Sequence, residues 1–66
     1  MFQVYCEEQF IGSFETYEEA LYKATKDGNT GANFIGCLEI DNKEIYTYVY
    51  NTPDGDEQLD FTIIFP

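Results

Sequence analysis

The sequence predicts an α+β fold, an antiparallel sheet of four to five strands with one helix packed on a face, in the order ββαβββ. Three observations lead to this fold. Several short stretches alternate apolar and polar residues, one stretch repeats its apolar residues every three or four positions, and polar turn residues separate the stretches. Strands before and after a single helix are typical of the α+β class. The 66 residues are enough for a single domain, residues 1–66, with a small core.

The first two strands are predicted at residues 2–6 and 10–14. Residues 2–6 alternate between apolar and polar side chains, which is the period of a β-strand. Residues 10–14 form a second short, mostly apolar stretch, and the polar residues 7–9 between the two suit a hairpin turn. The chain is therefore expected to begin with a hairpin.

A helix is predicted over residues 16–27. Thr16 and Glu19 have the spacing of a capping box, in which each side chain bonds to the free backbone N–H group of the other residue. Apolar residues follow at i, i+3, i+4 and i+7 from Tyr17, so they line one face of the helix. Glutamates in the first turn and lysines near the end suit the helix dipole. Gly28 is a natural C-terminal stop.

Three further strands follow a loop at residues 27–33 and close the chain. They are predicted at residues 34–40, 45–50 and 59–65. The turn at residues 41–44 contains an asparagine, which tolerates the positive φ of a tight hairpin. The turn at residues 53–55 has the sequence Pro-Asp-Gly, a strong turn signal.

Cys6 and Cys37 are the two cysteines of the chain. The N-terminal residues lack the basic segment and the longer apolar segment of a signal peptide. Two buried thiols are therefore expected, since cysteine is often buried, and a disulfide between them is the alternative. The expected compartment is the cytoplasm, and no segment is expected to span a membrane.

The charge balance excludes several classes of partner. Thirteen acidic residues stand against three lysines, with no arginine or histidine, so the net charge is -10. Binding to nucleic acid or to an anionic membrane depends on Lys and Arg, so neither is expected as a direct partner. The hydrophobic content of 44% and the aromatic content of 18% are too high for a disordered acidic tail.

The residue types that carry most enzymatic catalysis are absent or isolated. Without histidine, no side chain has an ordinary pKa between 5 and 8. Neither cysteine belongs to a Cys-x-x-Cys pair, and there is no phosphate-binding loop. The carboxylates of residues 54–60 are interpreted as a solvated loop, with a weak calcium site as the alternative. We therefore expect a chain that is not an enzyme and that needs no cofactor or metal.

The acidic residues are segregated along the chain. Residues 1–22 and residues 44–66 each hold five acidic residues and no base, whereas residues 23–43 are balanced. Adjacent N- and C-terminal strands would join the two sets into one anionic field. Such a field is interpreted as a docking surface for a basic partner, with ordinary solubility as the alternative. The predicted acidic contacts are Glu7, Glu8, Glu15, Glu18, Glu19, Asp54, Asp56, Glu57 and Asp60.

Tyrosines are predicted to anchor the same surface. Tyr46, Tyr48 and Tyr50 share one face of a predicted strand. If Ile45 and Val49 face the helix, the tyrosines line the open face of the sheet, where tyrosine makes strong interface contacts. The alternative is that the tyrosines form the core and that Ile45 and Val49 face outwards.

In size, acidity and order of elements, the whole chain resembles the small acidic inhibitors that phages and mobile elements encode against host defence. Anti-CRISPR proteins, anti-restriction DNA mimics and uracil-DNA glycosylase inhibitors belong to this group. The resemblance involves no shared motif, so no residue role is carried over from it. For the anti-CRISPR case, it implies a CRISPR effector as the target.

Charge and resemblance together predict a binding protein that inhibits a nucleic-acid-handling enzyme of the host by occluding its basic nucleic-acid-binding surface. Carboxylates would stand in for phosphates against Lys and Arg of the target. The alternative is a small accessory or assembly domain whose acidity serves solubility. We expect a monomer or a homodimer, acting in the host cytoplasm if it is phage-encoded.

Overall fold

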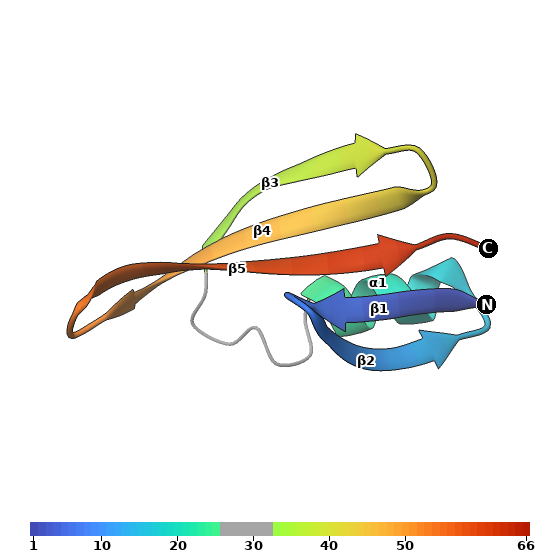
Figure 1. The fold of residues 1–66 in the computed structure, drawn as a ribbon, viewed down its shortest axis with the longest axis horizontal. Coiled ribbons are helices and arrows are strands. Elements are labelled where there is room, and N and C mark those ends of the chain that lie inside the picture. The colour runs from blue at the N-terminus through green and yellow to red at the C-terminus, as the bar shows by residue number, and fades with distance from the viewer. Residues whose placement is uncertain (26–32) are drawn as a thin grey trace.

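The computed structural model describes residues 1–25 and 33–66. Its elements are β1 (Phe2–Cys6), β2 (Gln9–Phe14), α1 (Tyr17–Thr25), β3 (Asn33–Ile40), β4 (Lys43–Thr52) and β5 (Gly55–Ile64). The strands form one sheet in the order β2-β1-β5-β4-β3, in which all neighbours are antiparallel (Figure 1). The predicted α+β fold, one helix on an antiparallel sheet, is confirmed.

The first and last strands are neighbours in the middle of the sheet. β1 pairs with β5 so that Val4 lies opposite Ile63 and Tyr5 opposite Thr62. On its other side, β1 pairs with β2 through the predicted N-terminal hairpin. Residues far apart in the sequence therefore meet at the centre of the fold. The adjacency of the N- and C-terminal strands, on which the prediction of one anionic field depends, is present.

The hairpin turns are tighter than the sequence patterns indicated. The β1–β2 and β3–β4 turns have two residues each, and the first of the two has a positive φ, 55° at Glu7 and 52° at Asp41. In the second turn it is therefore Asp41, and not the neighbouring Asn42, that takes the left-handed conformation. At the third turn, Gly55 has a φ of 125°, which only glycine adopts without strain.

The helix begins as the sequence predicts. Thr16 lies just before α1, and its Oγ1 accepts a hydrogen bond from Glu19 N at 3.2 Å, while Thr16 N donates to Glu19 Oε1 at 3.3 Å. This reciprocal pair is the predicted capping box. The helix runs to Thr25, and the predicted end at residues 26–28 lies outside the described residues. In the described ranges, no helix is long and apolar enough to span a membrane.

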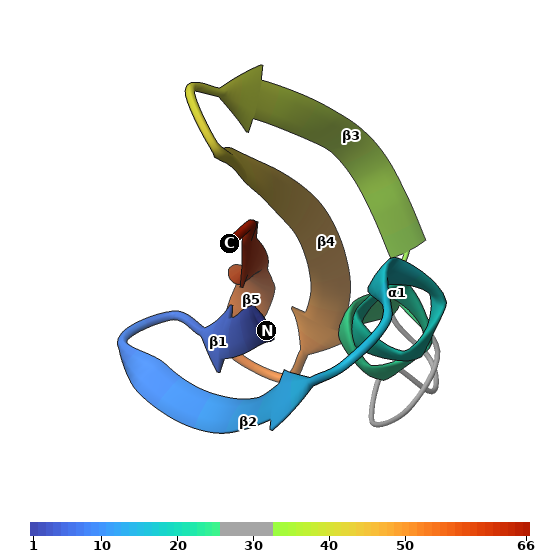
Figure 2. The same ribbon diagram turned by 90° about the vertical axis from the view of Figure 1, so that its right-hand side faces the viewer.

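The core lies between α1 and the concave face of the sheet, where α1 contacts mainly β1, β5 and β2 and where Tyr48 of β4 is also buried. Figure 2 shows α1 on the inner side of the curved sheet, between β4 and β2. Two alanines on the helix, Ala20 and Ala24, are fully buried, and their small side chains let the helix approach the strands closely. The buried residues are Val4, Ala20, Ala24, Tyr48, Phe61 and Ile63.

The prediction that the tyrosines of β4 line the open face of the sheet is wrong. Tyr48 is only 5% exposed, and its hydroxyl donates to the carbonyl oxygen of Thr25 at the end of α1. Tyr46 lies opposite Phe61 in the β4–β5 register, on the face that the helix covers. The alternative orientation therefore holds, because a tyrosine can bury its ring while its hydroxyl finds a partner on the helix.

The two cysteines do not meet. Cys6 lies on β1 and Cys37 on β3, with β5 and β4 between them, and both are free thiols. Cys6 is half-buried, but Cys37 is exposed, so the expectation of two buried thiols is wrong for Cys37. Its strand is at the edge of the sheet, beyond the part that α1 covers.

Candidate functional site

The β4–β5 hairpin extends well beyond the rest of the sheet. Along β4, the last residue paired with β3 is Val49, opposite Asn33, and along β5, the pairing with β1 begins at Phe61, opposite Cys6. In the part of the chain that the structure describes, residues 50–58 therefore form a two-stranded ribbon that projects from the rest of the sheet, at the left of Figure 1. We call residues 50–58 the acidic arm.

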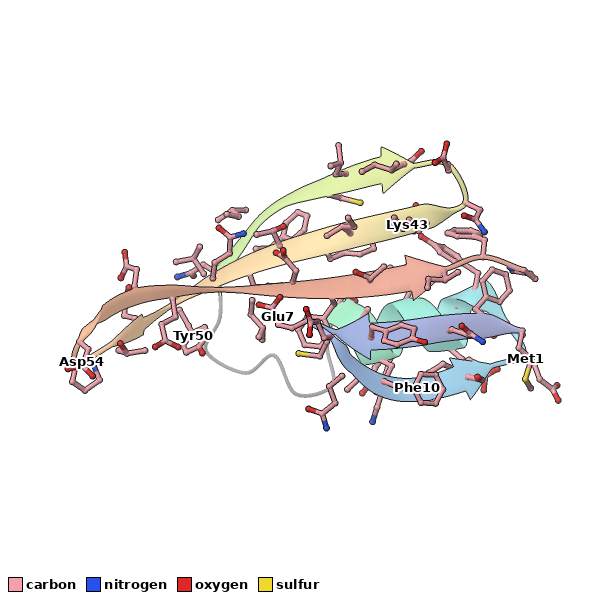
Figure 3. The ribbon with its side chains drawn as sticks, viewed as in Figure 1. Met1, Glu7, Phe10, Lys43, Tyr50 and Asp54 are labelled. Carbon is pink, nitrogen blue, oxygen red and sulfur yellow. The ribbon has the colours of Figure 1, made fainter. Side chains whose placement is uncertain are left out.

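The acidic arm carries Asp54, Asp56 and Glu57, all exposed, and no base. Asp54 lies at its tip (Figure 3). The Tyr50 hydroxyl donates a 2.8 Å hydrogen bond to Glu57 Oε2 across the two strands. This hydrogen bond, together with the charge of Glu57, raises the pKa of Tyr50. The tyrosine therefore stays protonated at neutral pH and holds one carboxylate of the arm in place.

The β1–β2 turn adds further carboxylates at the base of the acidic arm. Glu7 and Glu8 are exposed in this turn, and the Glu7 N–H donates to the Asp60 carbonyl oxygen at 2.8 Å. This hydrogen bond fixes the turn beside β5 at the base of the arm, and the charge of Glu7 is the last of the causes that raise the pKa of Tyr50. We call the resulting set the arm-end acids. They are Glu7, Glu8, Asp54, Asp56, Glu57 and Asp60.

The other three predicted acidic contacts lie elsewhere. Glu15, Glu18 and Glu19 are at or just before the start of α1, at the end of the sheet opposite the acidic arm (Figure 1). β2 runs away from the arm, so the residues that follow it are carried to the far end. Glu19 is also occupied in the capping box with Thr16. The predicted field is therefore divided, and the structure brings only the arm-end acids together.

Of the three predicted tyrosine anchors, only Tyr50 lies on the acidic arm. Tyr48 is buried in the core, where no partner reaches it. Tyr46 is half-buried beneath the start of α1. Their hydroxyl partners reflect this division, because Tyr46 and Tyr48 contact residues of α1, whereas the Tyr50 hydroxyl bonds to Glu57 on the neighbouring strand.

A hydrogen-bonded cluster that the sequence analysis missed joins α1 to β4. Glu44 Oε1 accepts hydrogen bonds from the Tyr17 hydroxyl at 2.6 Å and from the Tyr46 hydroxyl at 3.0 Å. The two hydroxyl oxygens are 3.0 Å apart. Glu44 and Tyr46 are two apart on one strand, which is a visible signal, but Tyr17 is recognisable as a partner only from the three-dimensional structure.

This cluster keeps its phenols protonated. Burial, and then hydrogen bonds with Tyr17 and Glu44, raise the pKa of Tyr46 far above its ordinary value. Burial, and then the bond to Glu44, also raise the pKa of Tyr17. A tyrosinate is therefore disfavoured here, and the cluster ties the helix to the sheet in the way a structural hydrogen-bond network does.

The thiols are also in their protonated forms. Partial desolvation by neighbouring atoms is the main reason that the pKa of half-buried Cys6 and the pKa of exposed Cys37 are raised, and the charges of nearby glutamates add to it. A reactive cysteine needs the opposite shift, because the thiolate is the nucleophile and the metal ligand. Within residues 1–25 and 33–66, no group of three or more Cys, Asp or Glu side chains is placed so that it could hold a metal ion.

Comparison with known proteins gives no relative from which a function is transferred. No protein-family model matches the chain, and neither a curated protein nor a solved structure shows significant similarity to it. The acidic arm therefore stands as the candidate site on its own geometry and charge.

Proposed function

We propose that this chain is a binding protein that inhibits a nucleic-acid-handling enzyme by inserting the acidic arm into the enzyme's basic nucleic-acid-binding surface. The observation that supports this most is the projection of residues 50–58 from the sheet, with the arm-end acids along and around them. The carboxylates stand in for phosphates and make charge-assisted hydrogen bonds with Lys and Arg of the target.

The density of charge suits this role. The stretch from Asp60 to Asp54 spans about 20 Å at the usual rise of about 3.3 Å per strand residue. Duplex DNA of that length carries about twelve phosphates, of which about half face one way. The six arm-end acids, spread over both faces of the arm and its base, are therefore comparable in number with the phosphates on one side of that length of nucleic acid.

The shape of the acidic arm also suits a channel. A two-stranded ribbon fits a groove of about 12 Å, as the entry of such ribbons into the DNA major groove shows. An enzyme channel that accepts nucleic acid is therefore wide enough to accept the acidic arm. No third strand among residues 1–25 and 33–66 pairs with the acidic arm, so the arm presents carboxylates on both faces and on its tip. Under this proposal, the target is a host enzyme such as a CRISPR effector, and the chain acts in the host cytoplasm.

The test compares two triple variants of equal net charge. One neutralises the arm (D54N, D56N and E57Q), and the other neutralises the far end (E15Q, E18Q and E19Q). Each takes the net charge from -10 to -7 by removing three acidic charges. Glutamine at residue 19 preserves the capping box, so both variants are expected to fold.

The partner is first recovered from a bacterial host lysate on the immobilised chain at low salt and identified. Its binding to nucleic acid is then measured in the presence of each purified variant. We expect the wild-type chain and the far-end variant to compete with nucleic acid, and the arm variant to compete about tenfold less well or worse. Competition should also weaken steeply as salt rises. Equal effects of the two variants, or no competition at all, would contradict the proposal.

A second candidate function, an accessory or assembly domain, is supported by a different surface. β3 carries three apolar side chains that are each more than half exposed, Phe34, Ile35 and Leu38. Its surface is therefore apolar, whereas that of the acidic arm is charged. An assembly contact made by such residues would strengthen or persist at high salt, whereas an arm-mediated contact would weaken. Salt dependence therefore separates the two functions.

A further inference from the structure

The outer edge of β3 is open. Among the described residues, no strand lies beyond β3, so one row of its backbone N–H and C=O groups lacks a strand partner (Figure 2). Proteins usually protect such an edge with lysine, proline or a very short strand. β3 has eight residues, with the sequence NFIGCLEI, and contains neither lysine nor proline. Its exposed large apolar residues are Phe34, Ile35, Leu38 and Ile40.

We propose that β3 pairs antiparallel with β3 of a second copy of this chain, giving a two-fold dimer with one continuous sheet. The inference does not depend on the proposed inhibitory function. An antiparallel edge is self-complementary under two-fold symmetry, because each copy offers the same donors and acceptors in reversed order.

The regular part of β3 is long enough for this pairing. The β-bulge at Ile35 disturbs only the start of the strand, and residues 36–40 pair one-to-one with residues 43–47 of β4. A strand that is regular on its inner edge presents a regular outer edge as well. Leu38 is the middle residue of this segment, so the two-fold axis is expected to pass near it.

The charge distribution favours a second copy over a basic partner. Glu39 is the one charged residue of β3, so a basic surface would find little to pair with there. Repulsion between two chains of net charge -10 is smallest when their acidic arms are far apart. Antiparallel pairing achieves this, because the arm lies beyond the Asn33 end of β3 and the two copies point these ends in opposite directions (Figure 1).

The buried area is compatible with a dimer of modest affinity. Phe34, Ile35 and Leu38 are 56%, 59% and 56% exposed, and Ile40 is 39% exposed. Phe34 and Ile35 lie beyond the paired residues 36–40, so coverage of all four side chains sets the upper limit. With full side-chain areas on the order of 150–250 Å², that limit is roughly 400 Å² of apolar area per copy, or roughly 800 Å² in total. The paired backbone edges bring the interface to about 1,000 Å², the lower bound for a specific interface. We expect a dissociation constant on the order of micromolar to tens of micromolar.

The test compares Leu38→Glu with Phe10→Glu. The register places these residues at opposite ends of one row across the open face of the sheet, through Ile45, Thr62 and Tyr5. Phe10 is 51% exposed and lies on β2, the other edge strand, so it is a matched control. In sedimentation velocity at moderate salt, we expect the wild type and Phe10→Glu to dimerise. Leu38→Glu should dimerise at least about tenfold more weakly.

Amide hydrogen exchange of the wild-type chain gives a second readout that needs no variant. Edge pairing should slow the exchange of the outward-facing amides within residues 36–40 as the protein concentration rises through the dissociation constant. A chain that stays monomeric up to about 500 μM would overturn the proposal. So would a dimer equally weakened by both variants, or one whose β3 amides exchange at a rate independent of concentration, because each result would place the contact on another surface.

Discussion

The Tyr17 hydroxyl donates a hydrogen bond of 2.6 Å to Glu44 Oε1, which links the first residue of α1 to the second residue of β4. These residues are 27 positions apart in the sequence. The bond ties the start of the helix to a strand outside the three on which the body of the helix packs. It therefore contributes to the orientation of the helix as well as to its stability.

Removing the Tyr17 hydroxyl should destabilise the fold. We expect Tyr17→Phe to lower the free energy of unfolding by about 1.5 kcal/mol, because a half-buried hydrogen bond to a carboxylate is lost while the ring packing is kept. Urea denaturation followed by circular dichroism measures the change. The control is Tyr22→Phe on the same helix, where the side chain is 59% exposed and the expected change is under about 0.5 kcal/mol. Similar losses in the two variants would argue against the Glu44 contact.

Stability should decrease in alkaline solution. The pKa values of Tyr17 and Tyr46 are raised in the folded state by burial and by their hydrogen bonds, whereas in the unfolded chain they are near 10. Their contribution is therefore complete below pH 10 and is lost as the pH rises above it, because the unfolded chain then loses protons that the folded chain retains. Urea midpoints at pH 8, 10 and 11 measure this. A Tyr17→Phe, Tyr46→Phe double variant should show a shallower decline, and an unchanged slope would refute the assignment.

The capping box makes a separate contribution at the start of α1. Thr16→Ala should cost about 1 kcal/mol of unfolding free energy, since the Glu19 N–H loses its acceptor. Glu19→Gln retains the reciprocal bond and should cost much less. Denaturation curves of the two variants at equal ionic strength give the comparison. If Glu19→Gln were as damaging as Thr16→Ala, charge at the helix end would be the dominant effect instead.

The β1–β2 turn allows a test of backbone strain with a neighbouring control. Glu7 has a φ of 55°, a left-handed conformation that costs a residue with a Cβ about 1 kcal/mol. Glu7→Gly should therefore stabilise the fold by a few tenths to about 1 kcal/mol. Glu8 does not share this conformation, so Glu8→Gly should destabilise it while making the same change in charge. Thermal unfolding of both variants distinguishes them, and a stabilised Glu8→Gly would indicate charge relief rather than relief of strain.

The local features of the fold were predictable from the sequence, whereas the choice of sheet face was not. The capping box and the apolar stripe of α1 depend on residues within a few positions of each other, and both are confirmed. The orientation of β4 depends on its register with β5, which places Leu59 and Phe61 opposite Tyr48 and Tyr46. Both faces of β4 carry large apolar or aromatic side chains, so alternation alone did not distinguish them.

The candidate site was predictable only in part for a similar reason. The acidic residues at 54–57 are recognisable as a turn from Pro53 and Gly55, but their projection follows from the different lengths of the strands. β4 and β5 have ten residues each, whereas β1 has five and β3 eight, and strand ends are set by pairing rather than by local composition. The separation of Glu18 from the arm likewise follows from the direction of β2.

The position of β5 between β1 and β4 determines when this chain can fold. Until residues 55–64 have left the ribosome, the N-terminal hairpin and the β3–β4 hairpin have no strand to join them. Isolated hairpins are only marginally stable in water, so the sheet is expected to form only once residues 55–64 are available to pair. The central pairing of the first strand with the last also closes a loop of almost the whole chain, which slows folding relative to a helical protein of equal length. Nascent chains shortened at the C-terminus should therefore be degraded, and the acidic arm would be held in its extended form only after the final strand has been incorporated.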